Sequence, residues 1–471
     1  MSATAGSGRS SKLPIAWLAI VAAAGLGGYG QLGANAARTS APASTGGFTG
    51  WEKEITHITA AGEPEIAVGP SGSPLLVAFN GCGIAVSHDR GNTFVVSGKN
   101  PADPGPTTGD PYHSCSDPAA AIGPHDVLYT GAGYWDTPGG SVDYYNMFVS
   151  HSDDGGVSWS DPVFATGDRD LPSQLLLGRN TGHSDRLFLT VDASAGTVYA
   201  SAGDFPRLVR WVVVSHDGGA TFGPPHAIDS NEYPQAQGEQ AGDYTPAAAN
   251  GVVAVAYVAS AAPGRSCPCG IFETSRDGAE TWTRHSTPFI ANWTAADPSH
   301  PGRFAIMSGQ GATGTPANPG FITITTTSDY GNTWTKPVLI GDGLHPRIQP
   351  WIAYSPTGVL GVGYKTLYTG LISQPTFLVD AVSGNVPGYY DYWTAVSFNN
   401  GRSFSLPIRV SNALSPPGNK AGNDDFSSVA LDDHYLYAAW GDQRTSPTNS
   451  TAGPVAVYFA RVPLTAYSTR R

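Results

Sequence analysis

The sequence Ser87-His-Asp89-Arg-Gly91-Asn-Thr93-Phe94 follows an eight-residue pattern, Ser/Thr-x-Asp-x-Gly-x-Thr/Ser-aromatic, that recurs along the chain. Further copies begin at Ser152, Ser215, Ser275, Thr327 and Ser397. The fourth has Ala279 at the glycine position, and the sixth has Asn399 at the aspartate position. The starts lie 65, 63, 60, 52 and 70 residues apart. A pattern repeated at this period predicts a repeat architecture in which each unit contributes one similar turn.

The residue types of the motif indicate a structural turn. Asp or Asn at the third position accepts hydrogen bonds from nearby main-chain amides, and glycine provides the positive φ that tight turns commonly require. The Thr or Ser hydroxyl ties the returning strand to the turn, and the aromatic ring packs against a neighbouring strand. We therefore assign these aspartates to turns and not to catalysis.

A second phrase, an apolar strand, a short turn and another apolar strand, precedes each motif, for example at 64–68 and 75–79. Its seventh copy, at 428–431 and 436–440, is followed by the strand 455–459 but by no motif. The early segment 54–59 is expected to supply the missing outer strand. The sequence thus predicts an all-β fold, a single β-propeller of seven four-stranded antiparallel blades, with six blades as the alternative. Ring closure removes exposed sheet edges.

Composition limits the classes of partner. Only 13% of the 471 residues are charged and the net charge is −12, with 59 Gly and 38 Pro. Nucleic-acid binding needs a basic face, so this class is excluded. Gly and Pro at this density favour short strands and tight turns. We expect a monomer that requires no cofactor and no metal.

The N-terminus has the features of an export signal. Arg9 and Lys12 precede an apolar run at 13–26, and Ala34-Asn35-Ala36 supplies a cleavage pattern. Residues 1–36 are therefore predicted to be a signal peptide, with an uncleaved membrane anchor as the alternative, and no other membrane contact is expected. Residues 37–50 have the composition of a flexible linker, and 51–471 form the propeller. The protein is expected outside the cell.

Four cysteines fit an oxidising compartment. Cys82 and Cys115 lie in consecutive repeats, and a disulfide between them could bridge the two repeats. A bridge between Cys267 and Cys269 would be strained because one residue separates them. Zinc is the competing interpretation for this pair, but no His-rich spacing accompanies it.

The six motifs resemble the Asp boxes of the sialidase superfamily. The phrases Ser116-Asp117-Pro118 and Trp440-Gly-Asp442-Gln-Arg444 resemble those of secreted bacterial Asp-box proteins, and the resemblance covers residues 51–464. It implies that the boxes lie on one face and that ligands bind on the opposite face. One departure concerns the first blade, where sialidases carry Phe/Tyr-Arg-Ile-Pro. This chain has Pro64-Glu65-Ile66-Ala67 and no arginine, which argues against sialic acid as the substrate.

Counting strands from each motif identifies the residues at the ends of the inner strands on the expected ligand face. They are Tyr112, His113, Trp135, Asp136, His183, Asp185, Arg186, Asp204, Glu239, Asp243, Tyr244, His345, Arg347, Lys365, Asp425, Asp442 and Arg444. The loop 366–389 leads into Tyr389-Tyr390-Asp391-Tyr392 on the same side. Carboxylates and a carboxylate-activated tyrosine are the groups that glycoside cleavage uses.

The leading hypothesis is a secreted glycoside hydrolase of sialidase-like fold that removes a terminal, anionic sugar. The nucleophile is Tyr244 or Tyr390, with Glu239 as its base and Asp243 or Asp185 as the acid/base. The substrate-binding set is Arg186, Arg347, Arg444, His113, Trp135 and Asp442, in which the arginines hold an anionic group. These side chains also suit structural roles, such as an arginine paired with a carboxylate or an aspartate that caps a turn.

Two other functions remain open. A polysaccharide lyase would use His113 or His183 with a tyrosine to remove the proton next to a uronic carboxylate, while an arginine neutralises its charge. A non-catalytic propeller that binds a glycan or a protein is the third hypothesis, and the missing arginine phrase favours it.

Overall fold

The computed structural model describes fourteen stretches of the chain. They are 52–56, 62–80, 83–103, 114–136, 144–165, 183–205, 209–236, 244–308, 320–368, 385–386, 389–415, 418–419, 427–444 and 455–468. The chain divides into units Met1–Thr45 and Gly46–Arg471, and all described residues belong to the second. The expected signal segment, the linker and the Cys82–Cys115 pairing therefore lie outside the described residues or side chains. Among the helices in these stretches, none is long and apolar enough to cross a membrane.

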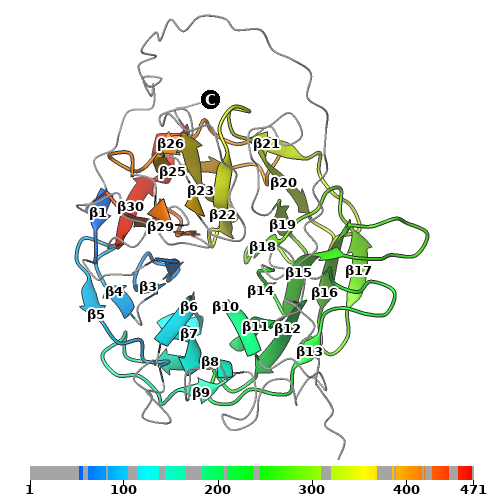
Figure 1. Ribbon diagram of the computed structural model, residues 1–471, viewed down its shortest axis with the longest axis horizontal. Helices are drawn as coiled ribbons and strands as arrows, with labels where there is room; N and C mark the ends of the chain where they lie inside the picture. The colour runs from blue at the N-terminus through cyan, green and yellow to red at the C-terminus, as the bar shows by residue number, and fades with distance from the viewer. Residues whose placement is uncertain are drawn as a thin grey trace, which may run out of the picture. The chain divides into compact units, whose positions relative to one another are not determined.

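Seven blades, each a four-stranded antiparallel sheet, are arranged around a central axis as a β-propeller (Figure 1). Blade one comprises β2 (Glu65–Val68), β3 (Leu75–Phe79), β4 (Gly83–Ser87) and β5 (Val95–Ser97), and blade two comprises β6 (Ser114–Ile122), β7 (Leu128–Asp136), β8 (Tyr144–Ser152) and β9 (Val163–Phe164). Blade three comprises β10 (His183–Asp192), β11 (Thr197–Phe205), β12 (Val209–Ser215) and β13 (His226–Ala227). Blade four comprises β14 (Ala247–Ala249), β15 (Val252–Ala259), β16 (Cys269–Ser275) and β17 (Thr283–Ser286). The lowest-numbered strand of each of these blades is innermost.

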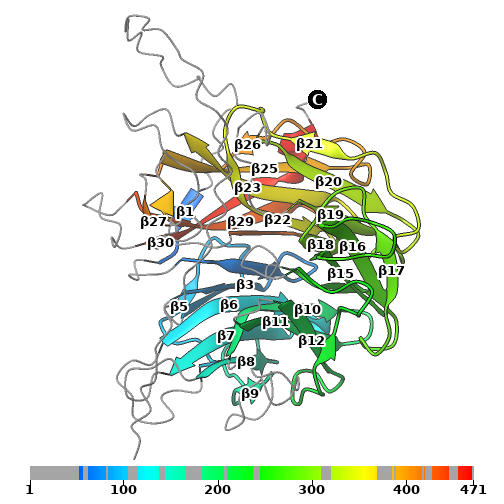
Figure 2. The ribbon, with the colours of Figure 1, turned by 45° about the vertical axis from the view of Figure 1, so that its right-hand side comes forward.

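Blades five to seven complete the ring (Figure 2). Blade five comprises β18 (Trp293–Ala296), β19 (Phe304–Met307), β20 (Ile322–Thr327) and β21 (Val338–Ile340). Blade six comprises β22 (Arg347–Tyr354), β23 (Leu360–Tyr368), β25 (Tyr389–Ser397) and β26 (Ile408–Arg409). Blade seven comprises β28 (Ser428–Leu431), β29 (Tyr435–Asp442), β30 (Ala456–Pro463) and β1 (Glu52–Glu54). Outside the blades lie β24 (Asn385–Val386) paired with β27 (Gly418–Asn419), the 3-10 turn η1 (Pro124–Asp126) and the helix α4 (Leu464–Ser468).

The N-terminal strand β1 closes the ring. It pairs antiparallel with β30, with Glu52 opposite Ala460 and Glu54 opposite Tyr458, so it is the outer strand of blade seven. The predicted closure is confirmed, and so is the count of seven blades, but the strand begins at Glu52 instead of at residue 54. The main-chain amide of Ile55 extends the pairing to the carbonyl of Val457 at 2.9 Å. The ring is therefore joined by residues about 400 positions apart.

Each eight-residue motif forms the turn between the third and fourth strands of its blade. In the third copy Ser215 Oγ accepts a hydrogen bond from the buried amide of Gly219 at 2.8 Å. Asp217 accepts from the amide and the hydroxyl of Thr221 at 2.9 and 2.6 Å. Gly219 has a φ of +84°, which glycine adopts without strain. The Thr221 hydroxyl and the Ser215 side chain lower the pKa of Asp217 to about 2, so each motif aspartate of this kind is fully engaged in its turn.

Neighbouring blades are joined along the axis by side-chain hydroxyl groups. The innermost strands have no strand partner on their inner edge, so their amides need other acceptors. Ser428 Oγ accepts from Ile66 N at 2.8 Å, which joins blade seven to blade one. Thr245 Oγ1 accepts from Thr294 N at 2.9 Å, joining blades four and five. These contacts fix the spacing of the inner strands.

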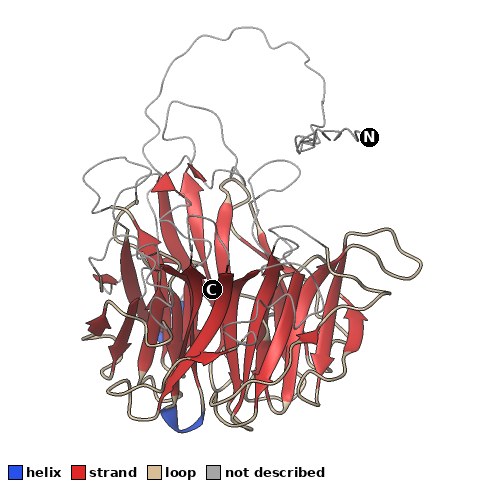
Figure 3. Ribbon diagram, turned by 60° about the horizontal axis from the view of Figure 1, so that its bottom comes forward, coloured by secondary structure: helices blue, strands red, loops and turns tan. Residues whose placement is uncertain are grey.

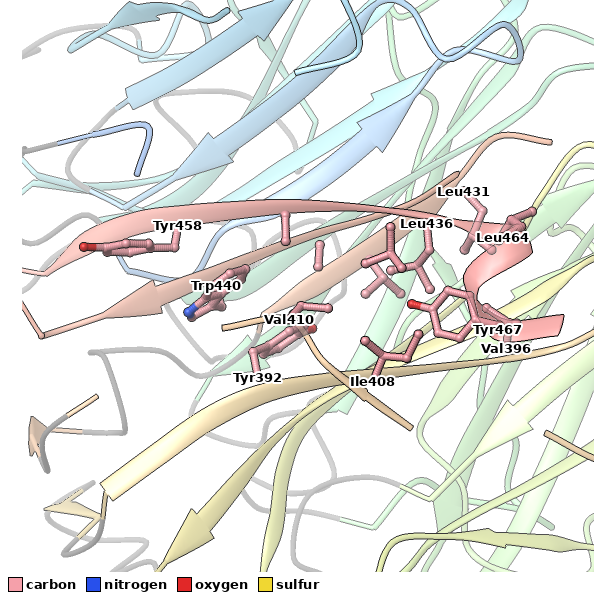
Figure 4. Close-up of a cluster of buried hydrophobic side chains, with 14 of the residues drawn as sticks. Tyr392, Val396, Ile408, Val410, Leu431, Leu436, Trp440, Tyr458, Leu464 and Tyr467 are labelled. Atoms are coloured by element: carbon pink, nitrogen blue, oxygen red, sulfur yellow. The ribbon is translucent and has the colours of Figure 1, made fainter. Parts of the chain in front are cut away.

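Apolar side chains fill the space between adjacent blades. The cluster between blades six and seven contains Tyr392 and Ile408 from one blade and Leu436, Trp440 and others from the next (Figure 4). The rings of Tyr392 and Trp440 are stacked, with centroids 5.3 Å apart and planes 5° from parallel. Burial of such faces is the main favourable term in folding, so each blade is stabilised mainly by its neighbours.

Candidate functional site

The strands run between two faces of the propeller (Figure 3). We call the face that carries the eight-residue motifs the turn face. The opposite face, called the loop face, carries the first residues of each inner strand and the last residues of each second strand. Because an antiparallel blade reverses direction at every strand, these two sets of ends meet on the same side. This places the described members of the predicted ligand-face set, such as Arg347 and Asp442, on the loop face.

Several predicted site residues lie outside what the structure describes. His113, Glu239 and Asp243 fall in undescribed segments. Trp135 lies near the end of β7 and Asp185 near the start of β10, where only the backbone is described, and the same holds for Arg186. Their backbone positions belong to blades two and three at the loop face. Their proposed roles remain predictions.

The two tyrosines predicted as nucleophiles are fully buried. Tyr244 has no exposed surface, and its hydroxyl lies 3.3 Å from the carbonyl oxygen of Val258 and 3.2 Å from the amide of the same residue. Tyr390 has no exposed surface either, and its hydroxyl donates to the carbonyl of Gly441 at 3.4 Å. Both hydroxyl groups bind the main chain of a strand, so neither is presented to a ligand in this conformation.

Arg444 and Asp442 form a paired unit at the end of β29. Arg444 Nε and Nη2 donate to Asp442 Oδ2 at 3.0 and 2.6 Å, and Nη1 donates to Glu52 of the closing strand at 2.5 Å. The guanidinium group also lies 4.4 Å from the ring centroid of Tyr458. Trp440 Nε1 donates to the same Asp442 oxygen at 3.1 Å. Two carboxylates thus compensate the arginine charge, and the unit ties β1 to blade seven.

Arg347 is the first residue of β22, and its charge is compensated as well. Its Nη2 lies 2.9 Å from Asp342 Oδ1, and its Nη1 donates to the carbonyl of His345 at 2.8 Å. Arg347 and Arg444 lie in adjacent blades, and each is paired with carboxylates of its own surroundings. Each of the two guanidinium groups therefore has at least one carboxylate partner already.

Asp342 also orients His345. The Nδ1 atom of His345 lies 2.6 Å from Asp342 Oδ2, and the two side chains are 28% and 41% exposed. Burial opposes ionisation of Asp342, but hydrogen bonds from the His345 side chain and from the amides of Leu344 and His345 outweigh it and lower the pKa of the carboxyl. A histidine whose Nδ1 is held by a carboxylate has its Nε2 available for proton transfer.

Tyr368, at the end of β23, connects this pair to a buried carboxyl. Its ring packs against that of His345 with centroids 4.9 Å apart, and its hydroxyl donates to Asp391 Oδ2 at 3.1 Å. Arg409 Nε lies 2.8 Å from the same oxygen. Burial raises the pKa of Asp391 to about 6, against the opposing effect of Arg409. Burial and the charge of Asp391 raise the pKa of Tyr368.

These contacts form one continuous group on the loop face of blade six, which we call the blade-six site: Asp342, His345, Arg347, Tyr368 and Asp391. It contains two carboxyl groups whose pKa values are displaced in opposite directions. Asp342 therefore stays ionised at a pH where Asp391 still exchanges its proton. A tyrosine in contact with a carboxyl group of raised pKa can attack as a nucleophile while that carboxylate takes its proton.

Blade four contains a counterpart with the same strand positions. Tyr257 on β15 donates to Glu273 Oε1 on β16 at 2.8 Å, and Arg284 on β17 contacts the same oxygen. Burial raises the pKa of Glu273 to about 7. Tyr257 has no exposed surface, whereas Tyr368 is partly exposed. The same tyrosine–carboxyl–arginine arrangement therefore occurs in blades four and six, and of the two tyrosines only Tyr368 of blade six is partly exposed.

The axis itself holds a cavity of about 230 Å³ lined by inner strands. The rings of Phe188, Trp293 and Trp351, from blades three, five and six, meet there with centroids 4.9 to 5.9 Å apart. Glu65 lines the cavity, and burial raises its pKa well above the ordinary value, against a hydrogen bond from Ala120. This carboxyl thus joins blade one to blade two, as Ser428 and Thr245 join other blades.

Sequence reasoning placed His345 and Arg347 on this face but overlooked Asp342, Tyr368 and Asp391 as functional residues. Asp391 lies within the phrase Tyr389–Tyr392 that drew attention to Tyr390, and Tyr368 lies within the loop 366–389. Strand alternation was the missing signal, because Tyr390 and Asp391 point to opposite sides of the sheet.

No protein-family model matches the chain, and no curated protein matches it. A Hadza microbial sialidase aligns over 66% of this chain and 64% of its own length, at 16% identity and a TM-score of 0.44. The match therefore spans less than two thirds of that sialidase.

Two further solved structures show similar values. An α-L-arabinanase from Penicillium chrysogenum covers 74% of this chain and 94% of its own, at 12% identity and a TM-score of 0.42. YCF48 bound to a D1 peptide covers 88% and 96%, at 11% identity and 0.44. Activity in propellers depends on the side chains at their loop ends, not on the blades.

Proposed function

We propose that the protein is an exported glycoside hydrolase that removes a terminal sugar at the blade-six site. The observation that carries this proposal is the contact of the partly exposed Tyr368 with Asp391 on one side and with His345 on the other. Together they supply a nucleophile, its base and a separate proton donor. The blade-six site thus contains the three roles that a retaining mechanism needs.

In the proposed reaction the oxygen of Tyr368 attacks the anomeric carbon, and its proton passes to Asp391. The glycosidic bond breaks as His345, oriented by Asp342, donates a proton to the leaving oxygen. Water then attacks the anomeric carbon of the glycosyl–tyrosine intermediate, and His345 takes the proton of that water. The bond to the tyrosine oxygen breaks, and Asp391 returns its proton to Tyr368. The raised pKa of Asp391 makes it a stronger base than an ordinary aspartate.

The arginine pairings favour an uncharged sugar over an anionic one. Asp342 neutralises Arg347, while Asp442 and Glu52 neutralise Arg444. An anionic group would have to displace a carboxylate from either arginine, which costs the pairing energy of a partly buried ion pair. We therefore propose a neutral terminal sugar at the position of bond cleavage.

A panel of fluorogenic glycosides, neutral and acidic, tests this function on the protein secreted from its full-length chain. We expect release of the fluorophore from at least one neutral glycoside, and little from the sialic acid derivative. Polyuronic acids are included because lyase action produces ultraviolet-absorbing unsaturated ends. If ultraviolet absorbance increases with a uronate polymer and no glycoside is cleaved, the protein is a lyase and the proposed hydrolase activity is wrong.

A non-catalytic propeller is the second candidate. The blade-four counterpart favours it, because the same tyrosine–carboxyl–arginine arrangement occurs there with no exposed surface on Tyr257 or Glu273. The same panel separates the two functions when it is paired with a glycan array. Binding without turnover of any substrate would support the non-catalytic function.

A further inference from the structure

Two cysteines lie together on the loop face of blade four, apart from the blade-six site. Cys269 is the first residue of β16 and pairs with Ala259 at the end of β15. Cys267 lies in the connecting hairpin, which is tightened by a hydrogen bond from Arg265 N to the carbonyl of Ala262 at 3.1 Å. The hairpin therefore holds both cysteines at a fixed edge of the blade.

The two thiols are not joined by a disulfide, are accessible and lie close to each other. Both cysteines are free and partly exposed. The Cys267 side chain is within hydrogen-bonding reach of Cys269, and Cys269 Sγ lies 3.7 Å from the carbonyl oxygen of Ser266. Two neighbouring thiols on one short loop can bind one ion between them with little loss of loop entropy.

The surroundings decide which ion suits the pair. In the part of the chain that the structure describes, no group of three or more His, Cys, Asp or Glu side chains could hold a metal. A structural zinc ion takes four protein ligands in a tetrahedral arrangement, and calcium or magnesium takes oxygen ligands. A two-sulfur site matches neither. Soft thiolates select Cu(I), zinc and iron–sulfur clusters, and of these only Cu(I) is satisfied by two sulfur ligands.

We propose that Cys267 and Cys269 form a two-thiolate site for a monovalent soft cation, Cu(I). Each thiol loses its proton as its copper–sulfur bond forms, so one Cu(I) ion replaces two protons, and no electron is transferred. The resulting unit carries one negative charge. Arg265 lies close enough to interact electrostatically with Cys267, so its guanidinium group compensates that charge. This inference does not depend on the proposed glycosidase function.

Anaerobic titration of the intact secreted protein with Cu(I), in competition with the chromophoric chelator bicinchoninate, tests the site. We expect one tightly bound Cu(I) per chain. Cys267→Ser and Cys269→Ser should each weaken binding by more than the roughly 10- to 100-fold that loss of an outer-shell partner costs. Ser266→Ala is the matched control, because Ser266 contributes only its main-chain carbonyl, and it should bind as the parent protein does.

Three outcomes would overturn the proposal. One is unchanged copper binding in the double variant C267S/C269S, which retains Cys82 and Cys115 and would locate the copper elsewhere. Another is a loss of binding in only one of the single variants, since both sulfurs are required. The third is that Zn²⁺ binds to the two cysteines as tightly as Cu(I) does and displaces it. Thermal unfolding of each variant verifies that the protein is folded, and the exposed hairpin makes a folding defect unexpected.

Discussion

Tyr368 donates a hydrogen bond to Asp391 across β23 and β25, and Tyr257 makes the corresponding contact with Glu273 across β15 and β16. The strand register is the same in both blades. Tyr368 pairs with Tyr389, two residues before Asp391, and Tyr257 pairs with Ile271, two residues before Glu273. What differs is the surroundings, because only Tyr368 is partly exposed and packs against a histidine. The two blades therefore offer a matched pair of variants.

Tyr368→Phe is expected to abolish glycoside turnover, because the nucleophilic oxygen is removed while the ring remains. Tyr257→Phe is the control, since it removes the same kind of hydrogen bond from a buried position. Its turnover should stay near that of the parent protein, although unfolding in urea should show a loss of about 1 kcal/mol. Equal loss of turnover in the two variants would assign Tyr368 a structural role.

The pH dependence of turnover should follow Asp391. The proposed base must be ionised, and its pKa is raised to about 6. We expect kcat/KM to rise with pH through about 6, as Asp391 ionises. Asp391→Asn should remove the activity at every pH. A rising limb near pH 4, the range of an ordinary aspartate, would contradict the assignment.

The same carboxyl affects stability in the opposite direction. Because the folded-state pKa of Asp391 is above its ordinary value of 3.8, the folded protein holds this proton more tightly than the unfolded chain. Its contribution to stability is fully present below about pH 4 and is lost as the pH rises through about 6. The free energy of unfolding of Asp391→Asn, measured in urea, should therefore increase relative to that of the parent protein as the pH rises from about 4.5 to about 7.5. A difference that does not change with pH would refute this linkage.

Within the third motif, Ser215 should matter more for stability than Asp217. Ser215 accepts from the buried amide of Gly219, whereas Asp217 accepts from groups of the exposed Thr221. Ser215→Ala leaves a buried donor unpaired, so a loss of about 1–3 kcal/mol is expected. Asp217→Ala should cost less, because water replaces the carboxylate. The denaturant midpoints of the two variants show which substitution lowers stability more. A larger loss for Asp217→Ala would mean that the carboxylate is the main stabilising group of the turn.

Removal of the closing strand should destabilise the whole ring. Residues 52–56 pair with β30, and Glu52 also binds Arg444, so a chain that starts at residue 62 exposes an edge strand and leaves a partly buried arginine with one carboxylate fewer. A chain that starts at residue 46 retains β1 and serves as the control. We expect a clearly lower melting temperature for the shorter chain only. Equal melting temperatures would show that β1 does not hold the ring closed.

The arrangement of side chains at the loop face was beyond the reach of sequence patterns. Tyr390 and Asp391 are adjacent in the sequence, yet the tyrosine hydroxyl binds the carbonyl of Gly441 while the carboxyl meets Tyr368 and Arg409. Likewise, nothing in the spacing of Arg347 and Arg444 shows that Asp342 and Glu52 neutralise them. Such pairings depend on which residues of different strands come within a few ångströms, and loop closure sets that distance.

The sequence by itself determined the fold, since a turn motif of eight residues depends only on local hydrogen bonds and recurs once per blade. Ser215 to Thr221 close their turn within seven residues, and six such turns with seven strand pairs imply a ring. Only the tertiary structure decided that Tyr368 contacts both His345 and Asp391, and that Arg347 and Arg444 are paired with carboxylates. Local turns are specified by neighbours in sequence, whereas burial and charge pairing are specified by neighbours in space.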